Sequence, residues 1–338
     1  MRRFFAVLAL ALTVSACEPG MPQTAAETPA MDAQILDAAA ERIAATAAPA
    51  RFGAGFLNLE SGELWAVAGS DRFPMQSVFK APLAAVVLAE VDAGRIALDQ
   101  VVTLSDEDLS PPFSLVGEAY PERRDYTVED LIVLATGRSD NTAADVLMRL
   151  VGGPGAVTAW LRSHGLKEMR VDRYERQLQP ELAGMGSFRP AWKTSAAYRE
   201  ALMGVPPLQR QAATAAYLRD PRDTTTPRDA LLFLSKLAAG ELLSPASTER
   251  LLTIMTETPT GANRLAAGLP DGARLAHKTG TARTDLGLTP AMGDMGIITL
   301  ADGRRYAVAV FFAGVTLPEA QAEALFADFA RAATAAAR

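Results

Sequence analysis

The chain has 338 residues, of which 49% are hydrophobic and 21% are charged, and its formal net charge is −6. This composition is typical of a globular protein and excludes long-range disorder, collagen and a disulfide-stapled miniprotein. One cysteine and two histidines exclude an internal disulfide and argue against a zinc site, so we predict no metal and no cofactor. The basic residues are scattered along an acidic chain, which argues against nucleic acid as a partner.

The first residues are typical of an export signal. Two arginines precede an apolar run from Phe4 to Val14, which is too short to span a bilayer but fits a signal peptide. Small residues then precede Cys17, an arrangement that resembles the bacterial lipobox. We predict a lipoprotein signal peptide over residues 1–16, lipidation of Cys17 and a flexible tether over residues 17–33. The protein would then be periplasmic and anchored to a bacterial membrane, inner or outer; an ordinary signal peptide with an incidental cysteine is the alternative.

The remaining pattern predicts one α+β domain over residues 34–338. The expected elements, in chain order, are a helix over 34–47, strands over 51–59 and 63–69, a helical and loop-rich middle from about 77 to 265, a strand pair over 295–300 and 305–315, and a helix over 318–337. Strands at both ends of the chain predict one antiparallel sheet built from both termini and flanked by helices. The segment over about 82–265 is expected to form an all-helical subdomain.

A serine and a lysine one helical turn apart form the first candidate catalytic motif. Ser77-Val78-Phe79-Lys80 opens an apolar helical run, and positions i and i+3 share one face of a helix. A serine hydroxyl becomes a good nucleophile when a neighbouring base takes its proton, and a desolvated lysine can be that base. At a helix N-terminus, Ser77 would also have backbone N–H groups beside a developing oxyanion. Taken alone, the motif favours a solvated helix start, so it must be weighed together with the other motifs.

Two further short motifs supply polar groups. The triplet Ser139-Asp140-Asn141 offers a hydroxyl that can pass a proton and an amide that can bind a carbonyl, and it can also cap the helix expected over 142–150. The segment Lys278-Thr279-Gly280-Thr281 offers a cation and two hydroxyls for a substrate carboxylate, and its glycine permits close approach of a ligand. An edge strand with an ordinary turn is the alternative for this last segment.

These three motifs, in this order, resemble those of the serine β-lactamases and penicillin-binding proteins. A fourth segment, Arg173-Tyr174-Glu175-Arg176-Gln177-Leu178-Gln179, resembles the Arg-x-Glu-x-x-Leu-Asn segment of class A β-lactamases, in which the glutamate activates the water that hydrolyses the acyl-enzyme. The resemblance extends over about residues 35–337 and implies the β-lactamase/transpeptidase-like fold. Gln76 and the 294–298 segment are similar to the subgroup that includes extended-spectrum cephalosporinases.

The resemblance implies a role for each matching residue. Ser77 is expected to be the acylated nucleophile, and Ser139 to deliver a proton to the departing lactam nitrogen. Lys80 and Glu175 are expected to share the proton transfer of acylation, with the choice of base left open. The backbone N–H groups of Ser77 and Thr281 would form the oxyanion hole. The implied substrate-binding residues are Asn141, Gln179, Arg264, Lys278, Thr279, Gly280 and Thr281.

Three positions depart from the family's usual pattern. Gln179 stands where asparagine usually helps to hold the deacylating water, and its extra methylene can change where that water lies. Asp145 stands where asparagine usually braces the loop that carries the glutamate. Met295 stands where many members have an arginine for the substrate carboxylate, and Arg264 is our candidate to supply that guanidinium instead.

The segment that follows Glu175 is longer than the resemblance predicts. Arg173 and Asp223 match the two residues whose ion pair closes the family's Ω-loop, yet ordinary Ω-loops have only about 6–16 residues. The extra length falls at about residues 180–220 and predicts helices over 195–203 and 208–218. This insertion either packs on itself without a function or borders the active site and alters substrate access or deacylation.

Together these features predict a monomeric class A serine β-lactamase that hydrolyses penicillins or cephalosporins and contacts the membrane through a lipid on Cys17. One alternative is a penicillin-binding DD-peptidase acting on peptidoglycan, against which Glu175 argues because it can activate water. The other is a β-lactam-binding or sensor domain that deacylates slowly, which Gln179 and the insertion keep open.

Overall fold

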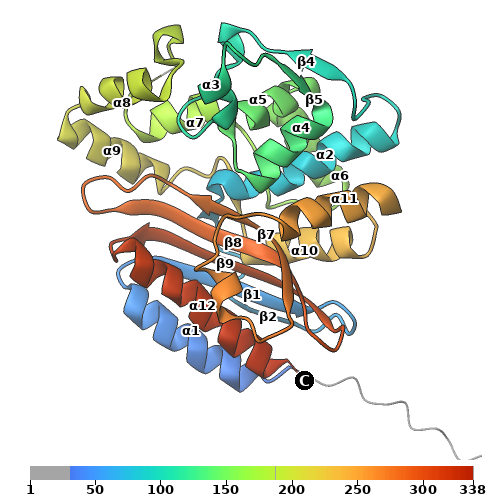
Figure 1. Cartoon of the computed structure of the whole chain (residues 1–338). Coiled ribbons are helices and arrows are strands. Elements are labelled where there is room, and N and C mark those ends of the chain that lie inside the picture. Colours follow the sequence, from blue (N-terminus) through green and yellow to red (C-terminus); the bar gives the residue numbers. More distant parts are fainter. Residues whose placement is uncertain (1–30, 187, 338) are drawn as a thin grey trace, which may run out of the picture.

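A five-stranded antiparallel sheet organises the protein, in the strand order β2-β1-β9-β8-β7 (Figure 1). The computed structural model describes residues 31–186 and 188–337, so the predicted signal peptide and Cys17 lie outside the described residues. The sheet consists of β1 (Arg51–Asn58), β2 (Leu64–Val67), β7 (Arg274–Thr281), β8 (Thr289–Thr299) and β9 (Arg305–Val315). This confirms the predicted antiparallel sheet from both ends of the chain. β8 begins at Thr289 rather than at Met295, because pairing with β7 and β9 overrides the low strand propensity of its Gly-Asp segment.

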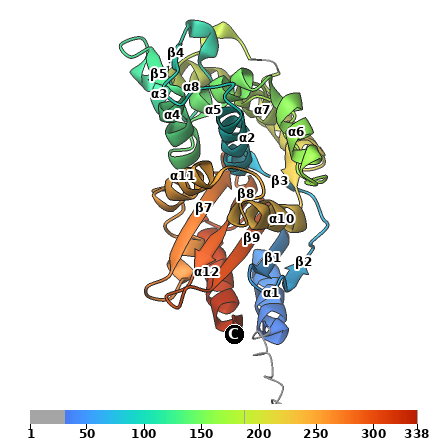
Figure 2. The same cartoon turned by 90° about the vertical axis from the view of Figure 1, so that its right-hand side faces the viewer.

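Two helices from opposite ends of the chain cover one face of the sheet, α1 (Ala33–Ala47) and α12 (Glu319–Ala336) (Figures 1 and 2). Aromatic side chains from β1, β9 and α12 fill the space beneath them, namely Phe52, Phe56, Tyr306, Phe312, Phe326 and Phe329. Their burial removes a large apolar area from water and fixes the sheet against the helices. The folded part begins slightly before the expected tether ends, because Met31 is buried and the Asp32 side chain caps α1.

The opposite face of the sheet carries the rest of the chain. α2 (Lys80–Asp92) passes through the interior, and every residue from Lys80 to Leu88 is buried. A helix that is apolar on all sides is typical of the middle of a core. α10 (Pro227–Ala238) and α11 (Pro245–Thr256) pack on this face of the sheet, and α11 also contacts α2. No helix within the described ranges is long and apolar enough to cross a membrane.

The subdomain above the sheet is mainly helical, as predicted, but it is not all-helical. It contains α3 (Leu115–Ala119), α4 (Val128–Ile132), a π-helical turn (Val133–Gly137), α5 (Asn141–Leu150), α6 (Pro154–Ser163) and α7 (Glu175–Leu182). Two short ladders join it, β4 (Val101–Thr103) with β5 (Asp125–Thr127) and β3 (Phe73–Pro74) with β6 (Thr224–Thr225). Strands of two or three residues are too short to show a period of two, so the sequence pattern did not reveal them.

The insertion after α7 contains two helices, α8 (Ser195–Met203) and α9 (Pro207–Tyr217). Both agree with the helices predicted from the sequence. They lie together at one side of the helical subdomain, next to α7 and above one end of the sheet (Figure 1).

Candidate active site

The nucleophile candidate Ser77 lies in a short 3₁₀ turn (Gln76–Phe79) that leads directly into α2. The edge strand β7 packs tightly against this turn at Gly280. A Cβ atom at position 280 would lie 2.3 Å from the carbonyl oxygen of Met75 and 3.1 Å from the backbone nitrogen of Ser77. Glycine is therefore required at position 280 for β7 to lie against the turn that carries Ser77, whereas the motif had predicted close approach of a ligand there.

Lys80 brings three of the four motifs together. Its Nζ atom donates hydrogen bonds to the carbonyl oxygen of Ser139 at 2.7 Å and to Oδ1 of Asn141 at 2.6 Å. The same atom lies 3.1 Å from Oε1 of Glu175, and neither of the two charged side chains is exposed to solvent. Buried charges are tolerated only when they are paired, so each of these side chains holds the other in place. The structure thus brings Lys80 together with Ser139, Asn141 and Glu175. The expected hydrogen bond from Lys80 to the Ser77 hydroxyl is not among the hydrogen bonds of the described residues, because the Lys80 amine is bound to these three partners instead.

In the Ser139-Asp140-Asn141 triplet, the central residue caps a helix and the other two contact Lys80. Asp140 is the N-cap of α5, and its side chain accepts a hydrogen bond from the backbone N–H of Ala143 at 2.8 Å. Ser139 adopts a positive φ of 61° just before this cap, and Asn141 begins the helix. The two interpretations of this triplet therefore hold together, because the central residue caps the helix while its neighbours face Lys80.

Lys278 is fully buried and connects the third motif to Ser139. Its Nζ atom donates to Oγ of Ser139 at 3.1 Å and to the carbonyl oxygen of Thr279 at 2.8 Å. Burial lowers the pKa of Lys278 well below its ordinary value, and the positive charges of Lys80 and Arg264 lower this pKa further. A lysine with a depressed pKa exchanges its proton readily, and the hydrogen bond to the Ser139 hydroxyl places that proton beside Ser139.

Glu175 is positioned by Asp145 beneath the first turn of α7. Oδ1 of Asp145 accepts the backbone N–H of Glu175 at 2.7 Å, and Oδ2 accepts the backbone N–H of Arg176 at 3.0 Å. Ser110 donates its hydroxyl to Oδ2 at 2.6 Å. These bonds satisfy backbone donors that a helix N-terminus leaves without partners. Asp145 therefore braces the segment that carries the glutamate, as an asparagine would in the family pattern.

The burial of Asp145 predicts a pH-dependent stability, because the hydrogen bonds that it accepts offset only part of the cost of burying its charge. Burial, together with the charge of Glu175, raises the pKa of Asp145 to about 6. This folded-state pKa is above the value of about 4 for an aspartate in the unfolded chain. The contribution of protonated Asp145 to the free energy of unfolding is therefore complete below about pH 4 and is lost as pH rises through about 6. Relative to Asp145→Asn, the wild-type free energy of unfolding should fall by about 3 kcal/mol between pH 4 and pH 7. Urea denaturation of both proteins across this pH range measures their free energies of unfolding. A difference between the two proteins that stays constant with pH would contradict the raised pKa of Asp145.

Gln179 lies one helical turn after Glu175 and contacts it directly. Its Nε2 atom donates to Oε2 of Glu175 at 2.8 Å and to Oε1 of Gln76 at 3.1 Å. Gln76 in turn donates its Nε2 to the hydroxyl of Tyr217 at 2.6 Å. Gln76 and Tyr217 were not among the predicted site residues. Gln76 precedes the nucleophile in the sequence, which was the signal available for it, whereas Tyr217 gave none beyond its place in the insertion.

Arg264 lies behind the third motif. Its Nη2 atom donates to Oγ1 of Thr281 at 2.7 Å, and its Nη1 atom lies 3.3 Å from the carbonyl oxygen of Gly280. Its Nε atom donates to Oε1 of Glu323 at 3.1 Å, and the side chain is buried. The sequence placed Arg264 near the substrate carboxylate site, and the structure brings it into contact with Thr281. Thr279 lies alongside, with its hydroxyl donating to Oγ1 of Thr260 at 3.0 Å.

A buried ion pair between two side chains closes the base of the long segment that carries Glu175. Nε of Arg173 lies 2.6 Å from Oδ2 of Asp223, although fifty residues separate the two in the chain. Arg173 also pairs with Glu181 at 2.7 Å and with Asp220 at 3.3 Å. The pair expected to close the Ω-loop is therefore present, and the insertion leaves the body of the protein and returns to it beside α7.

The insertion does not pack only on itself. Arg210 of α9 forms an ion pair of 2.8 Å with Asp285, in the turn between β7 and β8. A separate apolar cluster joins α7, α9 and the same end of the sheet, and it consists of Leu178, Leu182, Tyr217, Ala282 and Ala291. The insertion thus connects the helix that carries Glu175 with the edge strand that carries Lys278.

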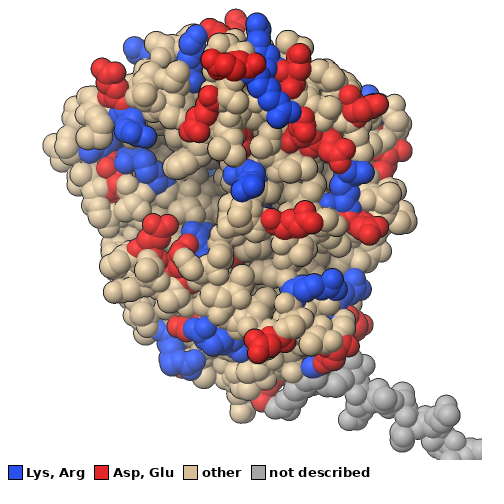
Figure 3. All heavy atoms as spheres, in the orientation of Figure 1, with Lys and Arg blue, Asp and Glu red and all other residues tan. Residues whose placement is uncertain are grey.

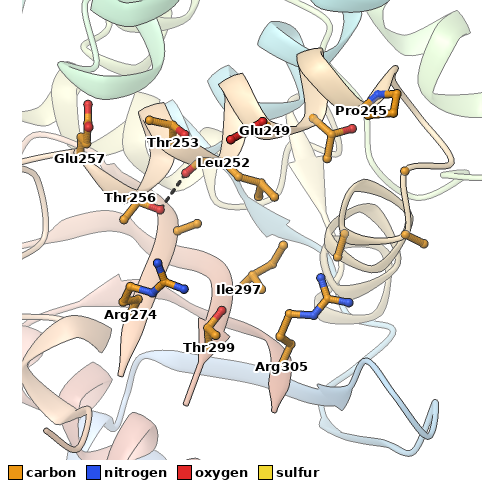
Figure 4. A pocket seen from close by; sticks show the side chains of 15 residues that line it. Pro245, Glu249, Leu252, Thr253, Thr256, Glu257, Arg274, Ile297, Thr299 and Arg305 are labelled. Carbon is orange, nitrogen blue, oxygen red and sulfur yellow. Dashed lines mark hydrogen bonds between the residues drawn. The ribbon is translucent and has the colours of Figure 1, made fainter. Parts of the chain in front are cut away.

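A separate cavity of about 650 Å³ lies between α11 and the sheet, at the end of β7 away from Gly280 (Figure 4). Arg274, Thr299 and Arg305 are cross-strand neighbours on its floor, and Glu249 and Leu252 of α11 face them. None of the motif residues lines this cavity, so the catalytic candidates lie elsewhere. Within residues 31–186 and 188–337, no three histidine, cysteine or acidic side chains are grouped so that they could hold a metal.

Charges on one face of the molecule follow no single sign (Figure 3). On the face shown in Figure 3, basic and acidic side chains are interspersed rather than gathered into separate patches. A nucleic-acid-binding face usually concentrates basic residues, and this face does not.

Comparisons with known proteins agree with this geometry. Residues 35–337 match the model of a family described as the β-lactamase enzyme family. β-Lactamase VEB-1 of Pseudomonas aeruginosa is 30% identical over 78% of this chain and 78% of its own. Extended-spectrum β-lactamase PER-1 of the same organism is 33% identical over 78% of this chain and 75% of its own. The solved structure of a class A β-lactamase described as the last common ancestor of Gram-negative bacteria has a TM-score of 0.72 and 33% identity, covering 90% of this chain and 99% of that one. The chain therefore belongs to the β-lactamase enzyme family, in which its structural neighbours include class A enzymes.

Proposed function

We propose that the protein is a serine β-lactamase that hydrolyses the amide bond of penicillins and cephalosporins through an acyl-enzyme on Ser77. One observation carries this proposal: the buried carboxylate of Glu175 lies 3.1 Å from Lys80, within the cluster that also holds Ser139 and Asn141. A carboxylate placed beside the nucleophile's lysine can activate water, which separates a hydrolase from a protein that stays acylated.

In acylation, Oγ of Ser77 attacks the lactam carbonyl carbon, and the bond from that carbon to the lactam nitrogen breaks. Lys80 and Glu175 provide the base that takes the serine proton, directly or through water. Ser139 delivers a proton to the departing nitrogen and can be resupplied by Lys278, whose pKa is lowered by burial. The backbone N–H groups of Ser77 and Thr281 would receive the oxyanion.

In deacylation, water attacks the ester carbon while Glu175 takes one of its protons. The ester bond to Ser77 then breaks, and the proton passes back to the serine oxygen, which restores the free enzyme. Gln179 holds Oε2 of Glu175 at 2.8 Å and so fixes the direction of the carboxylate. Asn141, Lys278, Thr279, Thr281 and Arg264 are proposed to bind the substrate amide and carboxylate.

Steady-state kinetics test this assignment against the DD-peptidase alternative. We expect the purified soluble domain to hydrolyse benzylpenicillin and an oxyimino cephalosporin with many turnovers, and to release no D-alanine from a peptide ending in D-Ala-D-Ala. The cephalosporin is included because Gln76 and the similarity to PER-1 support an extended-spectrum subgroup. Release of D-alanine without β-lactam turnover would overturn the assignment.

We also propose that Cys17 carries a lipid that anchors the enzyme in the periplasm. This rests on the lipobox-like segment before the cysteine. Cells fed an alkyne fatty acid should label the wild-type protein and retain it in the membrane fraction, whereas Cys17→Ser should lose both the label and the membrane association. An unlabelled wild-type protein in the soluble periplasmic fraction would contradict the anchor.

A further inference from the structure

We propose that the insertion is part of the catalytic apparatus, and that Tyr217 is a positioning residue that orients Glu175 through Gln76 and Gln179. The proposal rests on the proposed function, because it assigns Tyr217 to the deacylation step. It concerns a residue that the motifs of the sequence did not identify.

The contacts form a continuous chain from the insertion to the carboxylate. The Tyr217 hydroxyl accepts Nε2 of Gln76 at 2.6 Å, Oε1 of Gln76 accepts Nε2 of Gln179 at 3.1 Å, and the same Nε2 donates to Oε2 of Glu175 at 2.8 Å. Gln76 and Tyr217 are both buried. Water therefore cannot easily replace the hydroxyl if it is removed, and the Gln76 amide would lose its partner.

The direction of the Gln76 side chain decides what Gln179 can do. An amide has one accepting end and one donating end. With its donating end on Tyr217, Gln76 presents its oxygen to Gln179, so that Gln179 turns its own NH₂ group toward Glu175. Without the hydroxyl, Gln76 is free to turn over and present its NH₂ group, which repels that of Gln179. The Glu175 carboxylate would then be held less well.

The insertion holds Tyr217 firmly enough for this role. Tyr217 is the last residue of α9 and packs in the apolar cluster with Leu178 and Leu182 of α7. The ion pair between Arg210 and Asp285 fixes the other end of α9 to the turn after β7. Burial raises the pKa of the Tyr217 phenol, so it remains neutral and acts as a hydrogen-bonding group rather than as a base.

A pair of matched substitutions tests the proposal. Tyr217→Phe removes only the hydroxyl, and Tyr198→Phe is its control, because Tyr198 is buried in α8 of the same insertion and its hydroxyl takes part in none of the hydrogen bonds between described residues. Rapid-quench mass spectrometry with a cephalosporin gives the acylation and deacylation rates separately. We expect Tyr217→Phe to slow deacylation about tenfold with acylation changed less than about twofold, and Tyr198→Phe to match the wild type in both.

Action through Gln179 is tested by combining substitutions. In a Gln179→Ala background, Tyr217→Phe should change the deacylation rate by less than about twofold, because the connection is already broken. A full tenfold effect in that background would overturn the route through Gln179. Thermal unfolding midpoints of all variants identify any that lose activity through misfolding, in which case Tyr217→Met provides a second variant without the hydroxyl.

The outcomes separate this inference from the proposed function. If Glu175→Gln traps the acyl-enzyme but Tyr217→Phe deacylates like Tyr198→Phe, the positioning role is wrong and the function stands. If Glu175→Gln deacylates at the wild-type rate, Glu175 is not the general base of deacylation. The proposed function is then wrong in this step, and so is the positioning role of Tyr217.

Discussion

Replacing Ser77 with alanine is expected to abolish turnover of β-lactams and the formation of any covalent adduct. The proposed reaction forms its ester bond at Oγ of this residue, and the remaining side chains cannot substitute for that atom. The fall in kcat should be about 10⁵-fold, since removing a serine nucleophile leaves only the assistance that binding and the oxyanion hole give. Hydrolysis rates and the intact mass of the protein after incubation with benzylpenicillin measure both effects.

The control for this experiment is Ser163→Ala, because Ser163 is exposed at the end of α6 and its hydroxyl contacts Trp160 and His164 rather than any motif residue. It should retain the wild-type rate and the transient adduct. If Ser77→Ala still gained the mass of the opened β-lactam, the nucleophile would have to be assigned to another residue.

Replacing Glu175 with glutamine is expected to separate the two halves of the reaction. Glutamine keeps the size of the side chain but cannot take a proton from water, so the acyl-enzyme should accumulate. Lys80 keeps its hydrogen bonds to Ser139 and Asn141, which should preserve part of the acylation rate. We expect kcat to fall about 10³-fold, as is usual when a general base is lost, with a stoichiometric adduct on Ser77.

The matched substitution is Glu249→Gln on α11, an exposed glutamate outside the site. It should leave kcat and the adduct lifetime unchanged. An acyl-enzyme of Glu175→Gln that decays as fast as that of the wild type would show that another group activates the water.

Much of the catalytic cluster could be predicted from short motifs, because each motif is local and each carries its own chemistry. The spacing of Ser77 and Lys80 indicated one helical face, and the Lys278 segment indicated a strand that approaches a ligand closely. The structure adds the reason for the glycine, since a Cβ at position 280 would collide with the carbonyl oxygen of Met75. The sheet was also predictable, because its strands show apolar periods near both ends of the chain.

The contacts that depend on the path of the insertion could not be predicted in this way. Gln76 and Tyr217 are separated by 141 residues in the chain, and nothing in either local pattern points to the other. The sequence left open whether the insertion packs on itself, and only the packing of α9 against α7 and the β7–β8 turn places it at the site. The short ladders formed by β3, β4, β5 and β6 could not be predicted for a related reason. These strands are defined by pairing with a distant segment rather than by a local sequence pattern.

The central claim is that Ser77 is acylated and that Glu175 then releases it. The most direct test follows the intact mass of the wild-type soluble domain over time while it reacts with a chromogenic cephalosporin. The account predicts rapid colour change over many turnovers, with an adduct on Ser77 that is present only transiently. A stoichiometric adduct that persists after the colour change stops would show that deacylation does not work, and the protein would then be a β-lactam-binding protein. No adduct and no colour would contradict the account altogether.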